Sequence, residues 1–384
     1  MSADSPRSDT LESVRRAGVE TTGIEIIDEA DRTARPADLF WPWFAANVSV
    51  FGISYGSFVL DFGISFWQAL LVSVIGIVVS FLLCGLVAVA GKRGSAPTMV
   101  ISRAAFGVQG QKLPGVVSWI VSIGWETFLA IMATLATATV MRELGWGGGT
   151  PTKVVAMLVV AALIVTASVA GYHLIMRLQS WLTWLTGLAT IVYVALTVSH
   201  IDWSALTALE SGSFQQVIGA LIMVMTGFGL GWINIAADWS RYQRRDTSDG
   251  KIVFWNTFGG SVAPVVLVVF GVLLAGSDPA LNEAIAGDPI GALAAILPTL
   301  RRLGVTLVPE MAVAAGLLDG NRRTGSAVSD TRSGDAAISW RASKSAALTL
   351  VVRARTASRT DDGIGGQADQ ICLGGSVRTP PLDE

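Results

Sequence analysis

The stretch Gly227–Arg245, GFGLGWINIAADWSRYQRR, decides the fold. It begins as an apolar helix, carries glycines at alternate positions (227, 229 and 231) and ends in a polar, basic exit. A helix that only crosses lipid does not need such a glycine cluster, whereas a helix that opens its backbone around a ligand does. The stretch therefore predicts a loosened membrane helix beside a binding site.

The composition of the whole chain points to a membrane protein. Of the 384 residues, 52% are hydrophobic and only 15% are charged, whereas soluble domains carry about 25% charged residues. The net charge is −2, so no basic field favours nucleic acid. The two histidines have no cysteine nearby, and no nucleophile or phosphate-binding motif occurs. The sequence therefore predicts neither a metal site, nor a cofactor, nor an enzyme.

Seven apolar stretches follow a polar N-terminal segment. Each has about 17–25 residues, enough to cross a hydrocarbon core as a helix. We expect a disordered cytoplasmic tail over residues 1–38 and a transmembrane region of about seven helices over residues 39–299. The stretches are Phe40–Leu60, Ser65–Val89, Val116–Val140, Val154–Ala170, Trp181–Val198, Val217–Ala237 and Phe254–Ala275.

The basic residues between these stretches predict the orientation. With the N-terminus inside, the cytoplasmic segments before Phe254 hold 14 Lys and Arg, and the external segments hold 2. Lys and Arg are enriched in cytoplasmic loops. We therefore expect a multi-pass protein of the plasma membrane with a cytoplasmic N-terminus.

The composition changes near Leu300, where the chain becomes rich in Ser, Arg, Asp and Gly without periodicity. Such a stretch cannot bury enough apolar surface to fold. We hypothesise that the natural reading ends near residues 297–299 and that residues 300–384 are a disordered, out-of-frame tail. The alternative is a native disordered tail.

Glu126 is the only charged side chain in the seven stretches, and it lies near the middle of the third. An ionisable group at that depth costs about 3 kcal/mol on insertion scales, which makes it a functional candidate. The alternative is a protonated Glu126 that bonds a neighbouring helix for packing. Trp125 beside it offers a flat face at the same depth.

The first stretch has the same pattern as the opening one, with Asn47, Ser49, Gly52, Ser54 and Gly56 among aromatic residues. Paired glycine-interrupted helices at matching positions are typical of inverted-repeat transporters, where freed carbonyls and half-helix ends form the site. Glycines also serve close helix packing, which is the alternative for either helix alone.

Two connections carry candidates for gating or structural roles. The second, Gly91–Gly115, predicts a short interfacial helix that contains Arg103. In the sixth, Asp238 can reach Arg241 at i+3. Asn234 is the strong hydrogen-bonding side chain inside the apolar part of the opening stretch, and it lies near the inner end.

Three motifs resemble the nucleobase–cation symporter family, in its purine–cytosine permease branch. They are PADLFWPWFAANVSV (Pro36–Val50), PTMVISRAAFG (Pro97–Gly107) and AADWSRYQRR (Ala236–Arg245), and the resemblance covers about residues 30–299. It implies an all-α integral membrane fold of the LeuT-like type, with two inverted five-helix repeats. It also implies uptake of a nucleobase or related heterocycle, such as cytosine or a purine, coupled to H⁺ or Na⁺.

The resemblance implies site residues as well. The substrate ring is expected between Trp125 on the third helix and Phe228 on the sixth, with Trp232 as the second choice for the latter. Glu126, or backbone groups near Gly229, would contact its edges. The expected cation site includes the ion-binding residues Ala46, Asn47 and Ser49.

The chain departs from the family pattern after Leu300, where helix eight has no recognisable counterpart. The second repeat would then be incomplete, and we expect the chain as written to be impaired in transport. Saturable, cation-dependent uptake by cells that express this chain would contradict that expectation. The alternative function is a non-transporting membrane scaffold or an oligomeric subunit.

Overall fold

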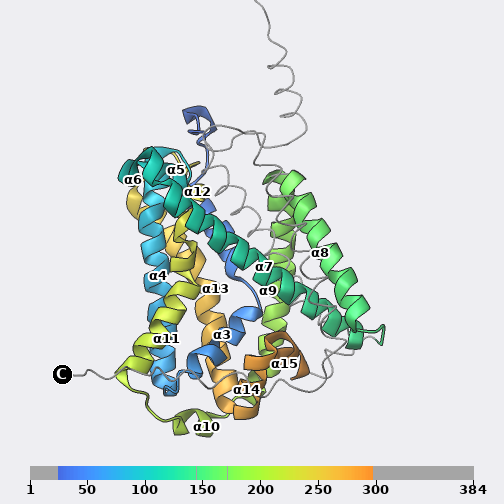
Figure 1. The fold of residues 1–384 in the computed structure, drawn as a ribbon. Coiled ribbons are helices and arrows are strands. Elements are labelled where there is room, and N and C mark those ends of the chain that lie inside the picture. The colour runs from blue at the N-terminus through green and yellow to red at the C-terminus, as the bar shows by residue number, and fades with distance from the viewer. Residues whose placement is uncertain (1–24, 144, 171, 297–384) are drawn as a thin grey trace, which may run out of the picture.

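Helices form the regular structure of the computed structural model, which describes residues 25–143, 145–170 and 172–296 (Figure 1). One isolated bridge, Ala34 to Gln243, is added to them. The helices are η1 Glu29–Asp31, η2 Pro36–Leu39, α2 Phe40–Asn47, α3 Phe51–Leu60, α4 Phe66–Gly94, α5 Thr98–Ile101, α6 Arg103–Gly110, α7 Lys112–Glu143, α8 Thr150–Ala170, α9 Tyr172–Thr197, η3 Val198–His200, α10 Trp203–Ala208, α11 Phe214–Gly227, η4 Gly229–Ile235, α12 Ala236–Ser240, α13 Asp249–Ser277, α14 Pro279–Gly287 and α15 Pro289–Ala295.

Among the described residues, five helices are long and apolar enough to cross a membrane, and a bent pair makes a sixth if it counts as one span. The remaining predicted stretch coincides with α8, whose segment Thr150–Ile164 is a shorter apolar helix. All seven predicted stretches thus lie on helices. The predicted tail at 300–384 and residues 1–24 lie outside the described residues.

The first predicted break is present between α2 and α3. The two helices are bent by 69°. Val48 leaves the helical region with φ −80° and ψ 90°, and its amide still donates to the Phe44 carbonyl at 2.9 Å. The described residues supply no backbone hydrogen bond to the carbonyls of Ala45, Ala46 and Asn47.

The second predicted break is present as well. The α-helix α11 ends at Gly227, Phe228 takes φ −111° and ψ −116°, and the next seven residues form the 3₁₀ helix η4 before α12 begins. A stretch of 3₁₀ helix inside a longer helix often marks a functional hinge. The glycine cluster of the opening stretch therefore marks a true change of backbone conformation.

A central body contains both broken helices together with α4 and α13, which pack against them and against each other. Its backbones approach closely at glycines. A Cβ on Gly56 of α3 would lie 2.1 Å from the Val272 nitrogen of α13, and a Cβ on Gly271 would lie 1.9 Å from the Ile53 carbonyl oxygen. Small residues permit this kind of contact between membrane helices.

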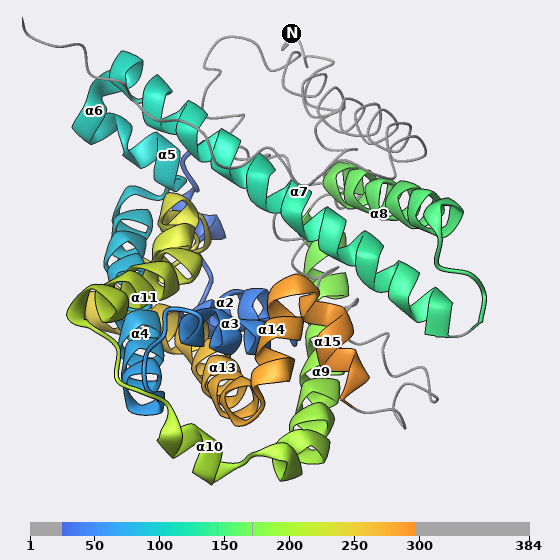
Figure 2. The ribbon, with the colours of Figure 1, turned by 60° about the horizontal axis from the view of Figure 1, so that its bottom comes forward.

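The helices α7, α8 and α9 lie outside the central body. Figure 2 shows α7 and α8 side by side on one flank, and they are in contact. Only 22% of the apolar window of α7 is buried, against 67% for α13. The helix α7 therefore presents much of its surface to the surroundings, and one of its faces lines the site described below.

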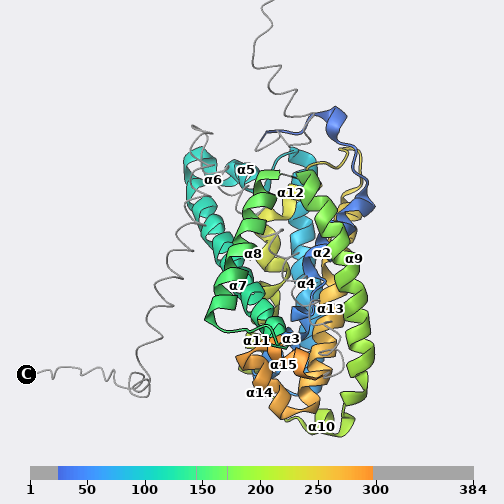
Figure 3. The same ribbon diagram turned by 90° about the vertical axis from the view of Figure 1, so that its right-hand side faces the viewer.

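The short elements gather at two opposite ends. Residues 25–38, α5, α6 and the exit from α12 lie at one end, which we call the α5 end (Figure 1). The helices α10, α14 and α15 lie at the other, the α14 end (Figure 3). This separation agrees with spans that alternate in direction.

The segment before α2 is packed at the α5 end. The side chain of Arg32 is fully buried, and its Nε donates to the Gln243 carbonyl at 2.8 Å and its Nη2 to the Lys92 carbonyl. The amide of Ile27 donates to the Ser95 carbonyl at 2.9 Å. The prediction of a disordered tail is therefore wrong for residues 25–38, because a buried cation and backbone bonds fix them to α4 and to the exit of α12.

Candidate functional site

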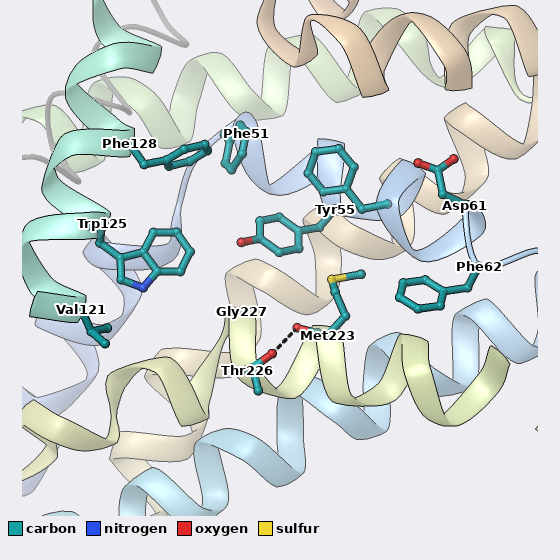
Figure 4. Close-up of a pocket in the computed structure, with 12 residues that line it drawn as sticks. Phe51, Tyr55, Asp61, Phe62, Val121, Trp125, Phe128, Met223, Thr226 and Gly227 are labelled. Carbon is teal, nitrogen blue, oxygen red and sulfur yellow. Dashed lines mark hydrogen bonds between the residues drawn. The ribbon is translucent and has the colours of Figure 1, made fainter. Parts of the chain in front are cut away.

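A cavity of about 710 Å³ lies between α3, α7 and the end of α11 (Figure 4). Its volume falls within the usual range for small-molecule sites. Most of its lining is aromatic or aliphatic. The lining residues are Phe51, Tyr55, Phe58, Asp61, Phe62, Val121, Gly124, Trp125, Phe128, Met223, Thr226 and Gly227.

One face of α7 supplies Val121, Gly124, Trp125 and Phe128. Their spacing of i, i+3, i+4 and i+7 places them on a single helix face. Glu126 follows Trp125 by one residue, so it points about 100° away around the helix. It is half-buried and is absent from the cavity lining. Trp125 therefore lines the cavity, whereas Glu126 lies on a neighbouring face of α7, outside the lining.

The opposite wall comes from α3, where Phe51, Tyr55 and Phe58 recur at helical spacing, and from Phe62 in the turn after α3. The ring of Phe51 meets the rings of Tyr55 at 5.8 Å and of Phe128 at 5.7 Å, both edge-on. Trp125 meets Phe128 at 5.9 Å in the same manner. Such edge-to-face contacts are favourable for aromatic pairs. The aromatic rings of α3 and α7 thus form one connected lining.

Tyr55 lies beside the second break, that of the sixth predicted helix, which consists of α11, η4 and α12 and is called the broken sixth helix below. Its ring centroid lies 4.7 Å from that of Phe228, with the planes tilted by 50°. A Cβ on Gly227 would lie 2.9 Å from Tyr55 Cε1, so a glycine is needed there to admit the ring. Figure 4 shows the Tyr55 hydroxyl directed across the cavity toward Trp125.

Polar groups of the lining are few, and two of them are already engaged. The Thr226 hydroxyl donates to the Ile222 carbonyl at 2.7 Å. Asp61, toward the α14 end, accepts a hydrogen bond from Asn282 Nδ2 at 2.7 Å, and the Asn282 side chain in turn accepts from the Ser57 hydroxyl at 2.7 Å. The cavity is therefore suited to a mostly apolar, flat ligand.

The residues predicted on the sixth helix lie in the helix packing behind the cavity. Phe228 is buried behind Tyr55. Gly229 packs against α4, where its amide donates to the Ser80 hydroxyl at 3.1 Å. Trp232 meets Trp43 edge-on at 5.7 Å. None of these three lines the cavity, whereas their neighbour Gly227 does.

The predicted ion-binding residues lie at the first break, outside the cavity lining. Asn47 is buried and its Nδ2 donates to the Trp43 carbonyl at 2.7 Å. The Ser49 hydroxyl accepts from the Phe51 amide at 3.2 Å. Ala46 precedes them, and its carbonyl is one of those that accept no backbone bond from the described residues.

The predicted gating residues lie toward the α5 end. Asn234 Nδ2 donates to the Ser118 hydroxyl at 2.8 Å and so joins η4 to α7. Asp238 accepts hydrogen bonds from the amide and hydroxyl of Thr98 at 2.9 Å and 3.0 Å, which caps α5.

The two arginines among the predicted gating residues lie at helix ends. Arg103 begins α6 and is half-buried. Arg241 follows α12, and its guanidinium lies 4.9 Å from the Tyr242 ring centroid. Asn234 and Asp238 thus connect the exit of the broken helix with its neighbours, and both arginines lie at the same end of the protein.

The aromatic face of α3 was not predicted from the sequence. Its signal was present, because Phe51, Tyr55 and Phe58 recur at spacings of four and three. That spacing marks one helical face. The polar and glycine residues of the same stretch drew the interpretation to the break instead.

Comparison with known proteins gives relatives that carry the name purine-cytosine permease. YxlA of Bacillus subtilis is 23% identical over 261 residues, which are 68% of this chain and 55% of that protein. Purine-cytosine permease FCY21 of Saccharomyces cerevisiae is 25% identical over 290 residues, 71% of this chain and 52% of the relative. The chain thus spans about half the length of the curated relatives it matches.

Solved structures show the same fold. The chain matches Mhp1, a nucleobase-cation-symport-1 family transporter, in a closed conformation with bromovinylhydantoin bound. The TM-score is 0.63 at 15% identity, over 87% of this chain and 73% of that one. The inward-facing conformation of Mhp1 gives a TM-score of 0.59 at 17% identity, over 81% and 73% of the two chains. The predicted all-α, integral membrane transporter fold is confirmed.

The family model described as permease for cytosine/purines, uracil, thiamine, allantoin matches residues 26–330. The match continues past residue 299, where we expected the natural reading to end. Since it covers most of the chain, and the relatives and the fold agree with it, the chain belongs to this permease family.

Proposed function

We propose that the chain takes part in cation-coupled uptake of a nucleobase or a closely related flat heterocycle. The observation that carries the proposal is the aromatic cavity between α3, α7 and the broken sixth helix. The ring would lie against the face of Trp125, with Tyr55 and, behind it, Phe228 on the other side. Stacking on an aromatic face suits every flat heterocycle, and a few polar groups then select among them. This activity is transport and involves no bond chemistry.

The coupling ion would bind at the first break or on Glu126. Freed carbonyls at Ala46 and Asn47 are hard oxygen ligands that favour Na⁺, whereas a carboxyl at membrane depth favours a proton. Ligand binding measured with and without Na⁺, and at two pH values, in the wild type and in Glu126→Gln distinguishes these two possibilities.

The gate would lie at the α5 end. Support comes from Asn234, which ties η4 to α7, and from Asp238, which caps α5. We propose a gating or structural role for Arg103 and Arg241 as well. We place this end in the cytoplasm of a cell whose plasma membrane holds the protein, because the basic connections gather there.

Replacement of Trp125 tests the proposal. In the purified full chain, Trp125→Ala removes the stacking face, and alanine substitutions of base-stacking aromatics cost about 1–3 kcal/mol. We expect the affinity for cytosine, hypoxanthine or hydantoin to fall about 5- to 150-fold by calorimetry. The control Trp203→Ala changes an exposed indole on α10 and should bind as the wild type does. Equal affinity in both variants would contradict the proposal.

A further inference from the structure

The hydroxyl of Tyr55 is a polar group of the cavity lining that makes no hydrogen bond within the described part of the chain, and the indole N–H of Trp125 is a second such group. Thr226 and Asp61 are engaged by the Ile222 carbonyl and by Asn282. Within the described part of the chain, Tyr55 has ring contacts but makes no hydrogen bond. A phenol can donate one hydrogen bond and accept others. The Tyr55 hydroxyl, with its hydrogen-bonding capacity unused, faces the space where the ligand would lie (Figure 4).

The position of this hydroxyl is fixed by packing. The Tyr55 ring lies against Phe228 at 4.7 Å and meets Phe51 and Phe58 edge-on at 5.8 Å and 5.7 Å. Gly227 closes the remaining side, where even a Cβ would come within 2.9 Å of the ring. A group held in this manner loses little freedom when it binds a ligand, so its hydrogen bond contributes to selectivity.

The surroundings also specify the charge of the ligand. Rings from α3 and α7 line the space near the Tyr55 hydroxyl, and the charged residue of the lining, Asp61, is bound to Asn282 toward the α14 end. Glu126 lies on another face of α7, so a charged ring near the Tyr55 hydroxyl would meet no counter-ion in the lining there, which is costly at membrane depth. A neutral ring with a carbonyl group fits, because the phenol can donate to that oxygen.

We infer that Tyr55 is a specificity-determining residue of the site, and that it selects neutral, flat rings with a carbonyl oxygen at the edge facing α3. Trp125 supplies the stacking face and Tyr55 reads the edge. This assignment rests on the proposed function and deepens it, since it names the chemical group by which one heterocycle is distinguished from another.

The test compares Tyr55→Phe with wild type on matched ligands. This variant removes only the hydroxyl and keeps the ring that packs on Phe228. Hypoxanthine and purine are flat rings that differ by the C6 carbonyl and the adjoining N1–H, so they report on that edge. We expect Tyr55→Phe to weaken hypoxanthine binding about 5- to 10-fold, the range of one lost hydrogen bond. Purine binding should change less than 2-fold, and the thermal midpoint should stay unchanged.

Tyr193→Phe is the matched control. Its hydroxyl is buried and donates to the Leu293 carbonyl at 2.9 Å, away from the cavity lining. We expect this variant to lower the thermal midpoint while the ratio of hypoxanthine to purine affinity stays at the wild-type value. A shift of that ratio in Tyr193→Phe as large as that in Tyr55→Phe would overturn the assignment.

The remaining outcomes separate this assignment from the proposed function. If binding depends on Trp125 but Tyr55→Phe weakens hypoxanthine and purine equally, or neither, the role of Tyr55 is wrong and the proposed function stands. If the wild type binds none of these rings, both are wrong.

Discussion

At the scale of single residues, Arg32 joins three segments of the chain. Its guanidinium donates to the carbonyls of Lys92 and Gln243, and it pairs with Glu29 at 3.4 Å. Burial lowers the pKa of this guanidinium, and the charge of Glu29 opposes that effect. A buried arginine remains charged, so removal of its side chain would leave buried carbonyls without a donor.

Arg32→Met should therefore destabilise the protein by about 3 kcal/mol, because hydrogen bonds from a charged group contribute about 1.5–3 kcal/mol each. Arg35→Met is the control, since the Arg35 side chain is 84% exposed and its pair with Asp38 spans 3.4 Å. Exposed pairs contribute little, so we expect a change below about 0.5 kcal/mol. Thermal unfolding in detergent measures both variants, and equal midpoints would refute the role given to Arg32.

At the scale of the elements, glycines fix how closely α3 and α13 approach. A Cβ on Gly56 would lie 2.1 Å from a backbone nitrogen, where no side chain can rotate away. Gly56→Ala must therefore separate the two helices, and overpacking of this kind costs about 1–3 kcal/mol. We expect a lower thermal midpoint in detergent.

Gly187→Ala in α9 provides the comparison, because a Cβ there meets nothing within 4 Å. A change from glycine to alanine inside a helix is favourable by up to about 1 kcal/mol. The midpoint of Gly187→Ala should equal or exceed that of the wild type. A Gly56→Ala protein that is as stable as Gly187→Ala would show that the α3–α13 contact tolerates a side chain.

Both broken helices could be predicted from glycine and polar residues inside apolar stretches. The role of each glycine could not, because packing and site glycines share one local pattern. Gly227 admits Tyr55 beside the cavity, whereas Gly229, two residues on, packs against α4. Likewise, Trp125 could be predicted as a cavity residue, but the burial of Phe228 behind Tyr55 depends on how α3 and α11 meet in space.

At the scale of the whole molecule, the basic residues of one end support the proposed direction in the membrane. The α5 end carries Lys92, Arg93, Arg244 and Arg245, several of them paired with acidic groups such as Asp249 and Glu29. The α14 end carries α10, α14 and α15 (Figure 3). The orientation predicted from charge stays a prediction, and the packing of residues 25–38 against the α5 end was not predicted.

Cysteine labelling measures the orientation. In a chain with Cys84 and Cys372 replaced, Glu210→Cys places a thiol at the α14 end and Asp246→Cys places one at the α5 end, both at exposed positions. A membrane-impermeant maleimide should label the first in intact cells and the second only after permeabilisation. The reverse pattern would place the N-terminus outside.

The 3₁₀ conformation of η4 also sets a length. Its seven residues rise about 2.0 Å each, against about 1.5 Å in an α-helix, so the segment is about 3.5 Å longer than the same residues wound as α-helix. It also turns about 20° more per residue, or about 140° over its whole length. Rewinding η4 would therefore retract α12 and rotate it by more than a third of a turn, which would carry the Asp238 carboxylate away from Thr98. The hydrogen bonds between Asp238 and Thr98 can therefore form only while η4 keeps its longer 3₁₀ conformation.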